Sequence, residues 1–305
     1  MIEAQNLSKR YGDKTAVRDL SFTVKPGLVT GFLGPNGAGK STTMRLIVGL
    51  DAPASGQVTV NGRRYVDFPA PLHEVGLLLE ARSVHGGRTA YAHLLALAHT
   101  HGIPRRRVDE VVEQVGLASV ARTRAGRFSL GMSQRLGIAA AMLGDPSVLI
   151  LDEPVNGLDP AGIRWIRELL RHLAGEGRTV LLSSHLMSEL ELTVDHLIVI
   201  GRGQLIADLS LDEFVRRHSK RSVRVRTPLA DELAHRLAGP NVSVSTVGRG
   251  ELEIAGLTSE QVGLKASQQG IVLFELTPRH VSLEQAFMQL TRDHVEYRAD
   301  KEIAA

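Results

Sequence analysis

The sequence contains no cysteine, which excludes disulfide bonds and thiolate metal sites. This absence fits a reducing compartment, so we expect a cytoplasmic protein. Aromatic residues make up only 4% of the chain, which disfavours a surface that stacks on nucleic-acid bases. The 36 basic and 33 acidic residues give a net charge of only +3, so no nucleic-acid partner is expected.

Long hydrophobic runs are also missing. No stretch approaches the roughly 18 apolar residues that span a bilayer, and the first residues, MIEAQNLSKRYG, contain no apolar signal core. We therefore expect any role at a membrane to depend on a partner. Hydrophobic residues nevertheless make up 43% of the 305 residues, which is enough for a core, and the length predicts two domains.

Short apolar segments alternate with helix-like ones over the first two thirds of the chain. Their composition predicts strands over 20–24, 28–33, 57–62, 75–79, 147–151 and 179–184. Helices are expected over 41–50, 89–100, 106–117 and 159–177, the last with Asp159 as N-cap and Pro160 in its first position. Wholly apolar strands are covered on both faces, so this part predicts an α/β domain with a parallel sheet. Residues from about 82 to 146 form a helical insertion.

The pattern changes after about residue 215. From 222 to 276 the expected elements follow the order strand, helix, strand, strand, helix, strand, ending with a strand over 271–276. This is the split βαβ order of a small α+β, ferredoxin-like domain, and we expect it to support a dimer or regulation. The predicted divisions are a first domain over 1–215, a basic linker over 216–221, a second domain over 222–292 and a tail over 293–305. The linker, RRHSKR, is interpreted as solvated, with contact to anionic lipid as the alternative.

A complete phosphate-loop pattern, GPNGAGKST, stands between an expected strand and an expected helix. Backbone N–H groups of such a loop surround the phosphates of ATP, while Lys40 reaches the β- and γ-oxygens and the Ser41 hydroxyl ligates Mg²⁺. The residues assigned to ATP binding here are Gly34, Pro35, Asn36, Gly37, Ala38, Gly39, Lys40, Ser41 and Thr42.

Two carboxylates follow the apolar strand in SVLILDEP. Unpaired charges at the end of a buried strand are costly unless a cation or a reacting group lies nearby. We assign Asp152 to Mg²⁺ and Glu153 to the activation of the attacking water, with helix capping as the alternative. His185 follows another apolar strand and is expected at the same sheet edge, where it contacts the γ-phosphate.

These motifs together resemble the ATP-binding subunits of ABC transporters. The phosphate loop, FSLGMSQR at 128–135, the acidic strand, NGLD at 156–159 and His185 occur in the family's order, and the resemblance covers residues 2 to about 215. It implies a P-loop NTPase fold and a head-to-tail homodimer. In that dimer the signature segment of one copy, with Ser129, Gly131 and Met132, completes the ATP site of the other.

The resemblance also assigns residues outside the main motifs. Asp159 crosses the dimer interface in the family, with the helix cap as the alternative interpretation. Tyr11 stands where the family places a ring against adenine, and Val17 where an apolar side chain flanks the base. Either residue could instead belong to the core.

Two positions depart from the family pattern. Leu130 replaces a signature glycine, and Glu80 replaces a glutamine that touches Mg²⁺ or its water, so Glu80 is a candidate metal ligand and slow turnover is expected. GLLLEARS and SLGMSQRLGIA resemble the drug and antibiotic self-resistance exporters of the daunorubicin-resistance type. That likeness implies a separate six-helix permease and a location at the inner face of the cell membrane.

Other interpretations are a non-transport ABC ATPase or a low-turnover, nucleotide-gated regulatory subunit. The first lacks sequence support, because neither a long coiled-coil insertion nor a second ATPase unit is present. A metal site at His93, His99 and His101 is disfavoured, because only one pair shares a helical face and no carboxylate completes the shell.

Overall fold

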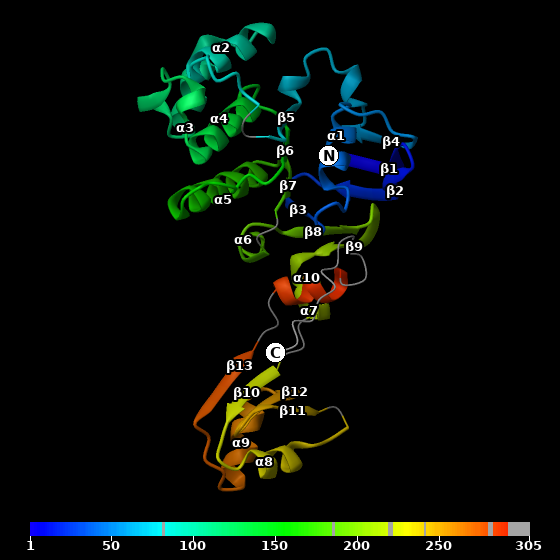
Figure 1. Ribbon diagram of the computed structural model, residues 1–305, viewed down its shortest axis with the longest axis vertical. Helices are drawn as coiled ribbons and strands as arrows, with labels where there is room; N and C mark the ends of the chain where they lie inside the picture. Colours follow the sequence, from blue (N-terminus) through cyan, green and yellow to red (C-terminus); the bar gives the residue numbers. More distant parts are fainter. Residues whose placement is uncertain (81–82, 185–186, 219–221, 241, 280–282, 292–305) are drawn as a thin grey trace. The chain divides into compact units, whose positions relative to one another are not determined.

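The computed structural model describes residues 1–80, 83–184, 187–218, 222–240, 242–279 and 283–291 (Figure 1). The chain forms two compact units, one containing residues 1–211 and the other residues 212–290. Within the described residues, no helix has the length and apolarity needed to cross a membrane.

The first unit is built on a six-stranded sheet in the order β5-β6-β7-β3-β8-β9. Its strands are β3 (Val29–Leu33), β5 (Val75–Leu78), β6 (Val148–Leu151), β7 (Thr179–Ser183), β8 (His196–Gly201) and β9 (Gln204–Ser210). All neighbours run parallel except β9, which pairs antiparallel with β8. Strands β3, β6 and β7 are buried along their whole length, as their apolar composition predicts.

A smaller antiparallel sheet has the order β2-β1-β4, with β1 (Ile2–Tyr11), β2 (Lys14–Val24) and β4 (Ser55–Val60). Helix α1 (Lys40–Ile47) contributes to one core with residues of both sheets. In that core the rings of Phe22 and Phe32 have centroids 5.5 Å apart. Strand β3 and helix α1, which flank the loop over residues 34–39, are therefore both fixed by packing in this core.

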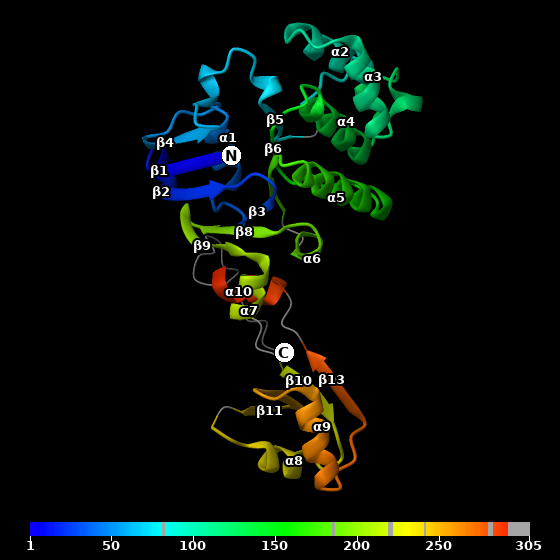
Figure 2. The same ribbon diagram turned by 180° about the vertical axis from the view of Figure 1, so that it is seen from behind.

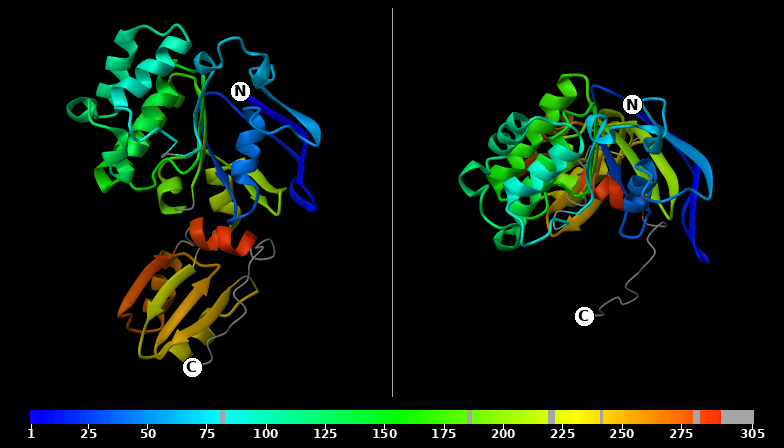
Figure 3. Two further views of the ribbon diagram at one scale, coloured as in Figure 1. Left: turned by 45° about the horizontal axis from the view of Figure 1, so that its top comes forward. Right: turned by 90° about the horizontal axis from the view of Figure 1, so that it is seen from above.

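Three of the remaining helices of this unit lie within the predicted helical insertion, residues 82–146. The remaining helices are α2 (Ala90–Thr100), α3 (Arg105–Gln114), α4 (Leu130–Met142), α5 (Pro160–Gly175) and α6 (Met187–Glu191). Helices α2, α3 and α4 lie together beside β5 and β6, and the blue antiparallel strands lie on the other side of the central strands (Figures 2 and 3). Asp159 caps α5 and Pro160 is its first residue, as predicted.

The second unit contains a four-stranded antiparallel sheet in the order β11-β12-β10-β13. Its elements are α7 (Leu211–His218), β10 (Ser222–Arg226), α8 (Ala230–Leu237), β11 (Ser243–Gly248), β12 (Glu251–Ala255), α9 (Ser259–Gln268), β13 (Glu275–Arg279) and α10 (Leu283–Thr291). From β10 to β13 this is the predicted strand and helix order. The sheet and helices α8 and α9 enclose a separate hydrophobic core.

Two sequence-based boundaries in this region are wrong. The last strand was expected over 271–276, but β13 covers Glu275–Arg279 and includes Pro278. A proline is tolerated there because β13 is an edge strand, while Ile271 packs into the core ahead of the strand. Residues 216–218 of the expected linker continue α7, which the Arg217–Glu213 ion pair supports, and 219–221 lie outside the described residues.

Candidate active site

The phosphate loop lies between the buried strand β3 and helix α1, and two of its glycines have no room for a side chain. Gly39 has φ 102°, and a Cβ atom there would lie 2.5 Å from the carbonyl oxygen of Ala16. A Cβ at Gly34 would lie 2.5 Å from the carbonyl oxygen of Ile200. Gly39 is also the N-cap of α1 and provides no side-chain cap, so the first N–H groups of this helix are available to an anion.

Lys40 is held inside this loop. Its Nζ donates to the carbonyl oxygen of Gly34 at 2.6 Å and of Pro35 at 3.3 Å. Burial lowers the pKa of Lys40, while the nearby carboxylates of Glu153 and Asp152 act in the opposite direction. A partly desolvated ammonium beside uncapped N–H groups favours a ligand with several negative charges.

Two carboxylate residues face the loop from the end of β6. Ser41 Oγ donates to Asp152 Oδ2 at 2.7 Å, and Ser183 Oγ donates to Asp152 Oδ1. Glu153 has a left-handed backbone with φ 50°, its N–H donates to Ser183 Oγ at 3.0 Å, and its carbonyl accepts from Gln134 Nε2 at 3.0 Å. Ser183 and Gln134 were not predicted from the sequence.

A cavity of about 440 Å³ joins these groups. Its size suits a nucleotide, since ligand pockets commonly measure about 300–1,000 Å³. It is lined by Tyr11, Lys14, Ala16, Asn36, Gly37, Ala38, Gly39, Lys40, Ser41, Thr42, Asp152 and Glu153.

Comparison with known proteins identifies the family. The family model described as "ABC transporter" matches residues 17–156, and a "Domain of unknown function (DUF8746)" matches residues 221–284. The "Uncharacterized ABC transporter ATP-binding protein YhcH" of Bacillus subtilis (strain 168) is 37% identical over 300 residues, which cover 97% of each chain. The chain belongs to the ABC transporter ATP-binding proteins.

Two further comparisons cover the ATPase unit. The "Bacitracin transport ATP-binding protein BcrA" of Bacillus licheniformis is 43% identical over 223 residues, covering 72% of this chain and 73% of BcrA. A solved dimeric structure of a bacterial ABC transporter cassette has a TM-score of 0.64 at 25% identity, covering 69% of this chain and 99% of the cassette. The chain is therefore an ATP-binding and ATP-hydrolysing subunit of this family.

The signature segment of this ABC ATPase lies at the start of α4. Ser129 is exposed, and its Oγ caps the helix by accepting from the N–H of Met132 at 3.2 Å. Gly131 is required by close packing, because a Cβ there would lie 2.6 Å from the carbonyl oxygen of Gly157. Leu130 covers Gly157, since a Cβ on that glycine would lie 2.4 Å from Leu130 Cγ. None of these residues lines the cavity of its own chain.

Other predicted site residues have mixed outcomes. Asp159 Oδ1 accepts from the N–H of Gly162 at 2.8 Å, so the capping interpretation is observed, and the carboxylate does not line the cavity. Glu80 is exposed and is not among the cavity-lining residues, and its assignment as a metal ligand stays a prediction. His185 lies outside the described residues.

The two residues assigned to adenine have different surroundings. Tyr11 is 46% exposed and lines the cavity, and its hydroxyl donates to Asp51 Oδ2 at 2.8 Å. Lys9 Nζ lies 5.0 Å from the Tyr11 ring centroid. Val17 does not flank the cavity as expected, because it is 0% exposed and packs in the core, and the neighbouring Ala16 lines the cavity instead.

Two oxygen-bearing side chains, one at the start of α1 and one after the end of β6, fit Mg²⁺. The Ser41 hydroxyl and the Asp152 carboxylate are oxygen ligands of the kind this cation prefers, and they already lie within 2.7 Å of each other. Elsewhere in the described part of the chain, no group of three or more histidine, aspartate or glutamate residues is arranged to hold a metal.

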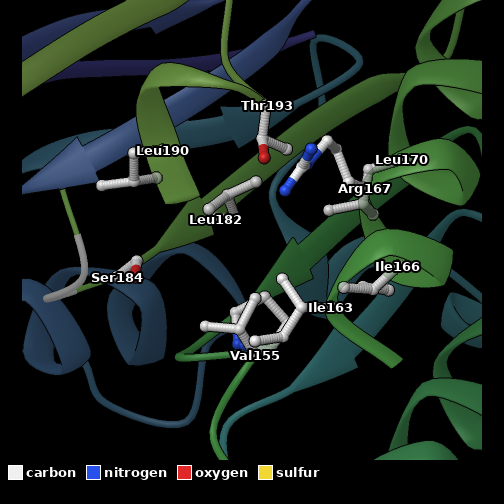
Figure 4. Close-up of a pocket in the computed structure, with 10 residues that line it drawn as sticks. Val155, Ile163, Ile166, Arg167, Leu170, Leu182, Ser184, Leu190 and Thr193 are labelled. Atoms are coloured by element: carbon white, nitrogen blue, oxygen red, sulfur yellow. The ribbon is translucent and has the colours of Figure 1, made fainter. Parts of the chain in front are cut away.

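Another, much smaller cavity is lined in part by the residues that follow Glu153 and is too small for a nucleotide. Its volume is about 10 Å³, which is about the minimum for one water. Apolar side chains that line it include Val155, Ile163 and Leu182 (Figure 4). The buried Pro154 and the half-buried Val155, which follow Glu153, share this lining with residues of α5 and β7.

Proposed function

We propose that this ATPase works as a homodimer in which each ATP is bound between the phosphate loop of one copy and the signature segment of the other. The observation that carries this proposal is the exposure of Ser129 outside the cavity of its own chain. A helix that begins with an exposed serine offers an anion site at its first N–H groups. Ser129 does not line the nucleotide cavity of its own chain, so the phosphate it binds must come from another copy. The dimeric form of the solved relative supports the same arrangement.

The main residues of the site have proposed tasks in hydrolysis. The loop N–H groups and Lys40 bind the β- and γ-phosphates, and Tyr11 supports the adenine ring. Ser41 and Asp152 hold Mg²⁺, which neutralises phosphate charge when it is bound. Glu153 orients the attacking water and accepts its proton, and His185 contacts the γ-phosphate. Ser129, Gly131 and Met132 of the partner copy exclude water and complete the site.

We further propose that the protein drives efflux of an antibiotic or similar compound through a separate membrane permease. BcrA supports this proposal, because its name assigns it to bacitracin transport and it matches nearly three quarters of both chains. The expected location is the cytoplasmic face of the membrane. Relatives named for transport favour this function over a non-transport ATPase or a regulatory subunit.

The dimer is tested with the Glu153→Gln variant, which retains the size and hydrogen bonding of the side chain but lacks the base. Hydrolysis should fall at least 100-fold, a typical loss for a general base, and MgATP should accumulate in a stable dimer. Sedimentation velocity with MgATP, with MgADP and without nucleotide provides the measurement. A variant that binds MgATP and remains monomeric at saturation would overturn the proposed dimer.

A further inference from the structure

We propose that Gln134 is a positioning residue for Glu153, and that it links the signature segment to the base of the same chain. This proposal rests on the dimer proposed above. In that dimer, Ser129 at the start of α4 touches the ATP held by the partner copy. Gln134, further along the same helix, bonds instead to the Glu153 backbone of its own copy.

The Glu153 backbone needs external support. Its φ of 50° lies in the left-handed region, which a residue with a side chain adopts only when its surroundings impose it. The N–H of Glu153 donates to Ser183 Oγ at 3.0 Å. The Glu153 carbonyl accepts from Gln134 Nε2 at 3.0 Å and, within the local turn, from the N–H of Asn156 at 3.2 Å. The backbone of this one residue is therefore held from β7 on one side and from α4 on the other.

Gln134 is well placed to transmit a displacement of α4. It is only 2% exposed, so its amide is fixed by the packing around it. The next residue, Pro154, is held separately, because it is buried and lines the small cavity of Figure 4 together with residues of α5 and β7. A shift of α4 would consequently move the Glu153 carbonyl relative to an anchored neighbour and rotate the carboxylate in the cavity.

This connection crosses between the two ATP sites. When Ser129 of one copy engages the partner's ATP, α4 is drawn into its bound position, and Gln134 then sets the base that serves the other ATP. Each ATP thereby prepares hydrolysis of its neighbour. Such coupling requires one structural element whose position depends on the state of both sites, and here that element is α4.

Mixed dimers test the proposal. A fixed amount of chain with Glu153 intact is combined with an excess of Glu153→Gln chain, so that one site per mixed dimer can hydrolyse MgATP. Gln134→Met is placed either in the intact chain or in the Glu153→Gln chain, and phosphate release per intact chain is measured. Methionine keeps the length of glutamine but cannot donate to the carbonyl.

With Gln134→Met in the intact chain, we expect hydrolysis to fall about tenfold, with the KM for MgATP changed less than twofold. The same substitution in the Glu153→Gln chain should change the rate less than twofold, although that chain supplies the signature segment of the working site. A loss in that second placement would assign Gln134 to the signature instead, and no loss in either placement would remove its role. Both results would overturn the proposal.

Controls separate this effect from damage to the helix. Ile138→Val removes one methyl group from a buried position on the same helix, four residues on, and should leave the rate unchanged in either placement. Gln134→Leu repeats the test if the methionine variant does not fold, as judged by thermal unfolding. Sedimentation of the same mixtures detects failure of the dimer itself. If no dimer forms with MgATP, the coupling between the two sites is refuted. A tenfold lower rate of hydrolysis in the Gln134→Met single variant would then support only the positioning of Glu153 by Gln134.

Discussion

The hydroxyl group of Ser183 contacts both residues that follow β6. It donates to Asp152 and accepts from the N–H of Glu153, and its side chain is completely buried at the end of β7. The proposed metal ligand and the proposed base therefore share one support. A small change at this position should alter catalysis more than ATP binding, because the phosphate loop does not depend on it.

We expect Ser183→Ala to lower kcat about 10- to 100-fold while the KM for MgATP changes less than threefold. The free energy of unfolding should fall by about 1–3 kcal/mol, because the variant leaves the partly buried Glu153 N–H without its acceptor. Phosphate release and urea unfolding measure the two effects. Thr179→Ala removes a buried hydroxyl from the opposite end of β7 and should retain kcat. Equal losses of kcat in both variants would contradict the role of Ser183.

Individual residues show where sequence reasoning succeeds and where it fails. The proposed roles of Lys40 and Asp152 followed from two short sequence motifs, in each of which neighbouring residues already indicate the function. Both residues line one cavity. Ser183 could have been found, because it is the polar residue that ends β7 directly after the apolar run 180–182, at the same sheet edge. Gln134 gave no such signal, since its partner lies 19 positions away and a mid-helix glutamine is usually solvated.

At the scale of single elements, helix α1 depends on the glycine that precedes it. Gly39→Ala would place a methyl group 2.5 Å from the Ala16 carbonyl in a backbone conformation with φ 102°. We expect ATP affinity to fall by about 100-fold, because relieving a strain of about 3 kcal/mol would turn the N–H groups away from the phosphates. Equilibrium binding of a fluorescent ATP analogue provides the measurement.

The matched control is Gly175→Ala at the end of α5, where a Cβ would meet no atom within 4 Å. It should leave ATP affinity unchanged and should stabilise the protein by about 0.5–1 kcal/mol. If Gly39→Ala bound ATP as tightly as this control, the requirement for glycine at the start of α1 would be refuted.

Elements with a strong local signal were predicted well. The apolar strands β3, β6 and β7 and the cap of α5 all lie where composition and capping residues placed them. The position of strand β13 was predicted wrongly. The apolar residues before it, such as Ile271, pack in the core but do not pair with a neighbouring strand. Periodicity identifies which residues are buried, but long-range pairing decides which of them form a strand.

The whole molecule contains two units with separate cores. The ATPase unit holds every described residue that lines the nucleotide cavity, and the second unit has its own sheet, helices and buried residues. The match of the second unit to a family model without a known function leaves its role as a proposal, and we favour support or regulation of the dimer. That a second copy completes the ATP site could be inferred only from the family resemblance. A single chain brings together only the phosphate-loop side of the site, because the signature segment of that site belongs to the other copy.

Site-directed cross-linking tests this shared site most directly, and the absence of native cysteine removes any background reaction. Asn36→Cys in the phosphate loop of one chain and Leu130→Cys beside Ser129 in another place single thiols at two exposed positions, in a Glu153→Gln background. With a short bismaleimide, the mixed chains should form a covalent dimer that requires MgATP, and neither variant alone should do so. A mixture that remains monomeric with MgATP bound, or that cross-links equally without nucleotide, would contradict the shared site.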